Sequence, residues 1–410
     1  MKEQLAQLVH RFRQQQQFAI GYSPLYAVIF GTIAEWLTNA PDDPVVRWLL
    51  QAIEDRPAFD ITNLLLAGLH REILRGVDEV AALAAYYPTV GGNASPALLF
   101  SDNRGELPVA SSPFVEALRK AILARRHVLQ TFIQKYTVQT NETGRGISWL
   151  LPACLARWDG VHLIDLGASA GLNLIAEQRS FQISGLDDDS ILMTLGYGQP
   201  VQFVVRVEGE IGNALAAKCR PPEILSRTGC DLHPFYLKST ADEITLASFI
   251  WADQVQRLQR LREGIGAFHE VNRKGVPVRL NSLSLPDELS ALLDRQINGP
   301  NEPVLLYNTY IKMYLPDKGQ MMRKHIADWA ITQDRSVVWI QWEPSQYVAV
   351  QSGQEPHFGW LAWTADLWRG HDQYQFHLGW VHPHGHHVQW LPGLQAWNFF
   401  WRQDAGLAKG

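Results

Sequence analysis

The chain has 410 residues, of which 46% are hydrophobic and 19% are charged, and this composition excludes an intrinsically disordered protein. Its 36 basic residues are outnumbered by 41 acidic ones, so the charge gives no sign of general affinity for nucleic acid or for an anionic membrane. We therefore expect a globular protein of more than one domain.

The cysteines and the first residues bear on the compartment. Cys154, Cys219 and Cys230 are too few and too scattered for a disulfide scaffold or a Cys-x-x-Cys zinc site. The chain opens on Met1-Lys2-Glu3 rather than on an apolar leader, and its longest apolar stretch, 26–37, is shorter than the ~20 residues that cross a bilayer. These features predict a cytoplasmic protein without a bound metal.

Residues 1–137 have apolar residues at helical spacing and predict a helical N-terminal lobe. Ser23-Pro24 is a typical helix start, because Ser caps the helix and Pro fits its first turn. Further helices are predicted at 45–53, at 61–74 and from Ser112 onward. The Thr-, Asn- and Gly-rich residues 137–148 predict a linker.

Strand-like and helix-like segments alternate in the rest of the chain, which predicts an α/β domain over 138–410 with a parallel sheet. Strands are predicted at 161–166, 228–232, 276–280, 304–307 and 337–342. Helices are predicted up to about residue 180 and at 247–268, 286–293 and 318–330.

Two antiparallel hairpins complete the predicted sheet. Ile191–Leu195 and Pro200–Glu208 predict a hairpin within an insertion at about 181–222. Residues 372–391 predict a C-terminal hairpin that turns at His384-Gly385. An antiparallel hairpin on an otherwise parallel sheet is compatible with this fold class.

A glycine-rich turn follows the first predicted strand and opens the next helix. The sequence there is Asp165-Leu-Gly167-Ala168-Ser169-Ala-Gly171. A dinucleotide fingerprint would need Gly at positions 169 and 172, and a phosphate-binding P-loop would need Gly-Lys-Ser/Thr. S-adenosylmethionine has no pyrophosphate, so this turn with its preceding acid suits that cofactor better, although an ordinary tight turn without a ligand is the alternative.

Polar residues follow the later strands, where open α/β sheets bind ligands. Asp231, followed by Leu232, ends the second strand and is expected to hold a ribose. Asn281 and Ser282 follow the third strand and suit an adenine edge. Asn308 and Tyr310 follow the fourth strand, and Glu343 ends the fifth.

Several segments of the chain carry a family resemblance, namely SPLYAVIF, YTVQTNETGRGISWLLPA, LIDLGASAGLNL, RTGCDLHP and FIWADQVQRLQRLREGI. They resemble the bacterial domain-of-unknown-function 2332 family, from about Ser23 to Trp390. That family is similar in fold to class I S-adenosylmethionine-dependent methyltransferases. The resemblance therefore implies a Rossmann-like methyltransferase sheet, with Ser169 standing where the usual turn has glycine.

Two further segments have more than one interpretation. Asn141, Glu142 and Arg145 could close over the cofactor or bind an anionic substrate, or they could form a helix cap and an interdomain salt bridge. The alternating His382, His384 and His386 could bind zinc. A solvated hairpin tip is the favoured interpretation, because no carboxylate or Cys lies in that segment.

The predicted function is methyl transfer from S-adenosylmethionine to a small or medium substrate, which depends mostly on positioning. Asn308, Tyr310 and Glu343 are expected to orient the nucleophile, and Glu343 could also accept its proton. The alternative is a non-catalytic sensor of S-adenosylmethionine or a nucleotide that signals to a protein partner. A nicotinamide enzyme is disfavoured by the missing glycines.

Overall fold

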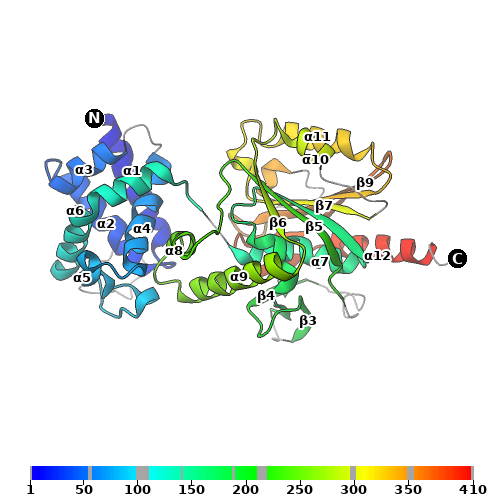
Figure 1. Cartoon of the computed structure of the whole chain (residues 1–410), viewed down its shortest axis with the longest axis horizontal. Coiled ribbons are helices and arrows are strands. Elements are labelled where there is room, and N and C mark those ends of the chain that lie inside the picture. Colours follow the sequence, from blue (N-terminus) through cyan, green and yellow to red (C-terminus); the bar gives the residue numbers. More distant parts are fainter. Residues whose placement is uncertain are drawn as a thin grey trace. The chain divides into compact units, whose positions relative to one another are not determined.

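The computed structural model describes residues 2–53, 58–97, 110–139, 142–186, 190–209, 219–295, 302–348 and 355–407. The chain forms two compact units (Figure 1). The helical unit contains Met1–Thr140 with Leu237–Arg262, and the α/β unit contains Asn141–Tyr236 with Glu263–Gly410. Residues 237–262 therefore belong with the N-terminal helices, although the sequence pattern had suggested the α/β domain for them.

The helices predicted for the N-terminal lobe are present. The helical unit contains α1 (Lys2–Ala19), α2 (Pro24–Asn39), α3 (Pro44–Ala52), α4 (Ala58–Leu74), α5 (Ala81–Ala84), α6 (Ser112–Lys135), α8 (Thr240–Ser248) and the start of α9 (Val255–Lys274), with short 3-10 turns η1 (Asp78–Val80) and η2 (Pro88–Val90). Ser23 caps α2 as expected, since its hydroxyl accepts a hydrogen bond from the Tyr26 N–H at 3.4 Å. Among the described residues, no helix is long and apolar enough to cross a membrane.

The prediction of a single helix over 247–268 is wrong, because α8 ends at Ser248 and α9 begins at Val255. Asp253 lies in the break between the two helices. Its carboxylate accepts from the Ser23 hydroxyl at 2.6 Å and from the Leu25 N–H at 3.3 Å. The non-helical backbone is therefore held by the amino end of α2.

The α/β unit contains a sheet of eleven described strands, in the order β3-β2-β4-β11-β10-β9-β8-β7-β1-β5-β6. The strands are β1 (Gly160–Leu166), β2 (Phe181–Gly185), β3 (Ile191–Leu195), β4 (Phe203–Glu208), β5 (Glu223–Asp231), β6 (Val278–Ser282), β7 (Val304–Thr309), β8 (Ser336–Glu343), β9 (Leu361–Arg369), β10 (Asp372–Val381) and β11 (His387–Trp390). The fold is thus mixed α/β, with a large and mostly parallel sheet.

Five neighbouring strands, β6-β5-β1-β7-β8, are all parallel. Along the chain, β1 is followed by β5 and β6 on one side and by β7 and β8 on the other. The direction in which strands are added therefore reverses between β1 and β7. In open α/β sheets, ligands bind at such a reversal, outside the carboxyl ends of the strands.

The insertion after β1 pairs differently from the prediction. The expected hairpin of 191–195 with 200–208 is wrong: β3 pairs antiparallel with β2, while β4 lies parallel between β2 and β11. Every second residue of β4 is buried, and Phe203 stacks on Phe181 of β2 with ring centroids 4.6 Å apart. The C-terminal hairpin is confirmed, since β10 and β11 pair antiparallel.

Helices cover both faces of the sheet (Figure 1). One face packs against α7 (Ile147–Ala156) and α12 (Pro392–Leu407), and the other packs against α10 (Leu289–Arg295) and α11 (Gln320–Ala330). Buried tryptophans dominate the core on the first face: Trp149, Trp342, Trp363 and Trp397. The helix expected after the glycine-rich turn is instead a seven-residue 3-10 segment, η4 (Leu172–Gln178).

Candidate functional site

The glycine-rich turn after β1 has a backbone that only glycine adopts easily at two positions. Gly167 has a φ of +93° and Gly171 a φ of +75°. A Cβ at Gly167 would collide with the side chain of Ile311, and a Cβ at Gly171 would lie 2.9 Å from Val278 Cγ1. Both glycines are therefore required by the close approach of the turn to neighbouring segments.

The N–H groups of this turn are used within the protein. The Gly167 and Ala168 N–H groups donate to the Cys230 carbonyl at 2.8 and 2.9 Å. The Ser169 N–H donates to Asp231 Oδ2 at 2.9 Å, and the Gly171 N–H donates to the Ala168 carbonyl at 2.7 Å. A pyrophosphate site needs such groups pointing at the ligand from the start of an α-helix. With these donors used and a 3-10 segment following, the turn is a poor phosphate site.

Asp231 lies beside the turn, at the carboxyl end of β5, and is partly exposed. Its two oxygens accept from the N–H groups of Ser169 and His233, each at 2.9 Å. A carboxylate oxygen has two lone pairs, so each oxygen can accept a second hydrogen bond. The adjacent Leu232 has 58% of its surface exposed. This edge thus combines a fixed carboxylate with an apolar side chain.

The residues expected after the third strand lie next to Asp231. Asn281 and Ser282 end β6 and are level with Cys230 and Asp231 of β5. The Asn281 amide donates to the Gly229 carbonyl at 3.3 Å, and the Ser282 hydroxyl donates to the Leu232 carbonyl at 3.2 Å. The structure therefore brings the predicted cofactor residues of β1, β5 and β6 to one edge.

Asp165 lies beneath this edge rather than on it. Its side chain is buried, and Asp165 Oδ2 accepts from the Tyr307 hydroxyl at 2.8 Å. Burial, with a smaller contribution from the charge of Asp231, raises the pKa of Asp165 to about 7. The predicted contact of Asp165 with a cofactor is thus replaced by a contact with a core tyrosine.

Asn308 and Glu343 are fully buried, with 0% exposure. Glu343 Oε1 accepts from the Asn308 amide at 2.6 Å and from the N–H of Ile311 at 2.8 Å, and the Lys312 N–H is 3.3 Å away. Burial is also the main cause that raises the pKa of Glu343. Neither side chain reaches the surface of the edge, so contact with a nucleophile does not fit their geometry. They stabilise the loop after β7 instead.

Tyr310, in that loop, is partly exposed and has a φ of +64°. Its N–H donates to the Trp342 carbonyl at 2.8 Å, and its ring faces the Arg145 guanidinium at 5.8 Å. The loop thus connects the carboxyl ends of β7 and β8 to the segment that contains Arg145. Of the three predicted catalytic residues, only Tyr310 has its side chain at the surface.

Glu142 and Arg145 lie in or next to η3 (Thr143–Gly146), whereas Asn141 falls outside the described residues. Arg145 donates from Nε to the Pro383 carbonyl at 2.9 Å. Glu142 Oε2 lies 3.3 Å from His384 Nδ1. The segment before α7 is therefore joined to the histidine-rich turn between β10 and β11, a partnership that no local pattern predicts.

The histidine-rich turn 382–386 lies at the same edge as the glycine-rich turn. Strand β10 runs parallel to β8 through the intervening β9, and Val381 and Glu343 pair with neighbouring residues of β9. His382 Nδ1 accepts from the His384 N–H at 3.2 Å, and burial together with the nearby histidines lowers the pKa of His382 to about 3. Across the described ranges, no three His, Cys, Asp or Glu side chains are grouped to hold a metal ion.

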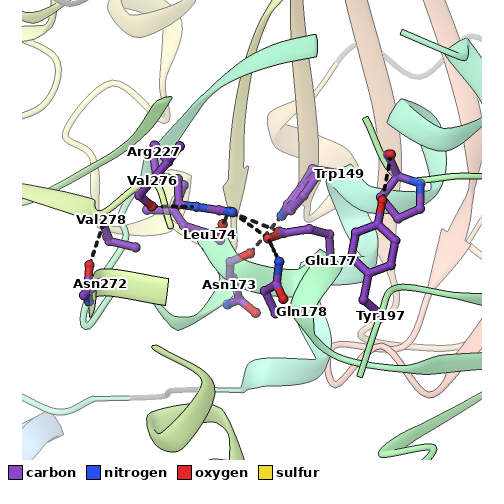
Figure 2. A network of polar contacts seen from close by, with 11 residues as sticks. Trp149, Asn173, Leu174, Glu177, Gln178, Tyr197, Arg227, Asn272, Val276 and Val278 are labelled. Atoms are coloured by element: carbon purple, nitrogen blue, oxygen red, sulfur yellow. Dashed lines mark hydrogen bonds and ion pairs between the residues drawn. The ribbon is translucent and has the colours of Figure 1, made fainter. Parts of the chain in front are cut away.

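A cavity of about 910 Å³ lies at the opposite ends of the strands. It is lined by Asp159 and Glu223, which adjoin the starts of β1 and β5, and by the buried pair Glu177 and Arg227 (Figure 2). None of the residues that line the cavity is among the predicted site residues, and Asp159 and Glu223 lie at the amino end of β1 and β5, whereas the glycine-rich turn follows the carboxyl end of β1. The cavity is therefore distinct from the candidate site.

No curated protein and no solved structure matches the chain. One family model does match, over residues 9–390, and its description is "Uncharacterized protein conserved in bacteria". That match includes the glycine-rich turn, Asp231, the Glu142–Arg145 segment and the histidine-rich turn. The chain therefore belongs to this bacterial family, DUF2332.

Proposed function

We propose that the protein is an S-adenosylmethionine-dependent methyltransferase that acts on a small or medium molecule. In this proposal the parallel strands β6-β5-β1-β7-β8 are the Rossmann-like half of a class I methyltransferase sheet. Support comes from the reversal between β1 and β7, which is where such sheets bind their ligands.

One observation carries the proposal most directly, namely the pairing of the glycine-rich turn with Asp231. The turn uses its N–H groups internally, and Ser169 donates its own to Asp231. The ligand side of this edge therefore offers acceptors and negative charge rather than donors for phosphate. A positively charged ligand with ribose hydroxyls fits that chemistry, and a dinucleotide does not.

Each predicted cofactor residue at the edge has a part in this proposal. Asp231 accepts hydrogen bonds from the ribose, and the exposed Leu232 packs against the base. Asn281 and Ser282, which lie alongside on β6, offer polar groups for the adenine edge. The bound S-adenosylmethionine would supply an activated methyl group on a sulfonium centre. The protein contributes by holding the acceptor in line with that group.

The sensor alternative has one observation in its favour. Asn308 and Glu343, expected to handle the nucleophile, are fully buried. A binding protein would need no group at the edge to take a proton. The two functions are distinguished by whether bound S-adenosylmethionine is turned over to its demethylated product.

Isothermal titration with S-adenosylmethionine, its demethylated product and NAD tests the cofactor assignment. We expect Asp231→Ala to weaken S-adenosylmethionine binding roughly ten- to 150-fold, because a charged hydrogen bond contributes ~1.5–3 kcal/mol. Asp231→Asn keeps an acceptor and should lose less. Asp159→Ala, an exposed acid before β1, is the matched control. Tight binding of NAD without binding of S-adenosylmethionine would overturn the proposal.

A further inference from the structure

Methyl transfer to a hydroxyl or an N–H group releases a proton, which a positioned base can accept, and Glu343 is buried too deeply to do so. The edge contains another acid–base pair. His384 Nδ1 lies 3.3 Å from Glu142 Oε2, and the two side chains are 25% and 6% exposed. The imidazole thus reaches solvent, whereas its carboxylate partner is nearly enclosed.

The pair is fixed from both sides. Glu142 Oε1 accepts from the Gly144 N–H at 3.3 Å, and the His384 N–H donates to His382 Nδ1. Because the pKa of His382 is lowered to about 3, that ring is neutral near pH 7 and can accept this bond. Gly385, with a φ of +75°, permits the approach of the two segments: a Cβ there would lie 3.3 Å from the Gly144 carbonyl oxygen.

Contacts connect the pair to the glycine-rich turn. Gly167 packs against Ile311, whose neighbour Tyr310 faces Arg145. Arg145 in turn donates to the carbonyl of Pro383, the residue before His384. The segment of Arg145 also packs on η4, the continuation of the glycine-rich turn, since Gly146 lies against Ala176. The pair is therefore part of the same edge as the proposed cofactor site.

We propose that His384, oriented by Glu142, is the base that accepts the proton of the methyl acceptor. This inference rests on the methyltransferase function proposed above. It specifies the acceptor as a hydroxyl or an N–H group, since these carry a proton that must leave. In this proposal the Nδ1 proton is held by Glu142, 3.3 Å away, so that Nε2 is the basic nitrogen, as in other bases oriented by a carboxylate.

The step balances. The acceptor's lone pair forms the bond to the methyl carbon, and the carbon–sulfur bond breaks with its electron pair remaining on the donor sulfur. The acceptor's proton passes to His384 Nε2. The imidazolium that results is stabilised by the carboxylate of Glu142 across the 3.3 Å contact.

The first test needs no acceptor. Imidazole nitrogen shifts, read from long-range proton–nitrogen NMR spectra of the full chain, report which ring nitrogen of a neutral histidine carries the proton. We expect the Nδ1–H form at His384 in the wild type and its loss in Glu142→Gln. Comparison with His384→Gln assigns the signal. A wild-type His384 that carries its proton on Nε2 would overturn the inference.

The second test measures methyl transfer from tritium-labelled S-adenosylmethionine to the small-molecule fraction of a bacterial extract. We expect His384→Ala to lower transfer ~100-fold or more, Glu142→Gln to lower it less, and added imidazole to restore part of the His384→Ala activity. His371→Ala, an exposed histidine at the other end of β10, is the control.

Binding by titration separates the two proposals. If His384→Ala binds S-adenosylmethionine normally and transfers methyl at the wild-type rate, His384 is not the base, but the methyltransferase proposal stands. If His384→Ala loses methyl transfer and added imidazole does not restore it, His384 has a structural role and is not the base. A wild type that binds S-adenosylmethionine but methylates nothing in the extract overturns the methyltransferase together with the base and favours the sensor. A wild type that does not bind it overturns both proposals.

Discussion

Two carboxylates on neighbouring strands, Asp165 of β1 and Asp231 of β5, have opposite environments. Asp231 is partly exposed, and its oxygens accept from backbone N–H groups that hold it in place. Asp165 is buried, so its charged form is penalised, and the hydrogen bond that the Tyr307 hydroxyl donates to it offsets only part of that penalty. The same residue type is therefore accessible to a ligand at one position and enclosed in the core at the other.

The raised pKa of Asp165 predicts a pH dependence of stability. With a folded pKa of about 7 against 3.8 ordinarily, Asp165 keeps its proton in the folded protein at pH values where the unfolded chain has lost it. Its contribution to stability is full below about pH 4 and falls as the pH rises toward 7, by up to ~1.4 kcal/mol per pH unit. Asp165→Asn should remove this slope, as measured by urea unfolding between pH 4 and 8. The same slope in Asp165→Asn as in the exposed-site control Asp159→Asn would contradict the assignment.

At the scale of elements, a buried ion pair joins η4 to β5 (Figure 2). Arg227 of β5 donates to Glu177 Oε1 at 2.5 Å and to the Leu174 carbonyl of η4, and the two charged side chains are almost fully buried. The pair holds η4 directly behind the glycine-rich turn. It explains why that segment is ordered although it is not an α-helix.

Breaking this pair should be strongly destabilising. Glu177→Met leaves Arg227 buried without its charge partner, and we expect a loss of about 3–5 kcal/mol in the free energy of unfolding. The double variant Glu177→Met with Arg227→Met should recover much of that loss, because no buried charge remains. Urea unfolding of both single variants and the double variant gives the coupling free energy between the two side chains. Additive losses in the double variant would show that the two charges do not depend on each other.

Local signals predicted most elements but not their pairing. The apolar runs at 161–166, 304–307 and 337–342 form β1, β7 and β8, and the glycine-rich turn follows β1 as expected. The alternation at 201–208 predicted a strand, but its neighbour β11 is distant in sequence. Glu142 and His384 likewise lie on distant segments, so their contact depends on strand order, which no local pattern contains.

At the scale of the whole molecule, the chain passes between its two units three times. The first passage follows Thr140, three residues after the predicted limit of the N-terminal lobe at residue 137. The return over 237–262 could not be predicted from composition, because α8 and α9 have the same amphipathic character as helices of either unit. What assigns this return to the helical unit is a set of specific contacts around Trp251 and Asp253.

Trp251 is the centre of an aromatic cluster in the helical unit. Its ring stacks on Tyr26 with centroids 4.9 Å apart and an interplanar angle of 15°. Three further rings meet it at steep angles, at centroid distances of 5.6–5.9 Å: Phe18, Tyr22 and Phe30. Such pairs stabilise beyond the area they bury. Trp251 therefore contributes to the stability of α1 and α2 although it lies far from them in sequence.

Trp251→Ala should accordingly destabilise the helical unit alone. We expect a loss of roughly 3 kcal/mol, at the lower end for a tryptophan because the side chain is only partly buried. Hydrogen exchange followed by mass spectrometry should show faster exchange in α1, α2 and α8 and unchanged protection in β1, β7 and β8, since cooperative units open separately. Phe399→Ala on α12, where the ring is 61% exposed, is the matched control and should leave both patterns intact. Faster exchange in both units of Trp251→Ala would mean that the two units unfold together, and that residues 237–262 transmit stability between them.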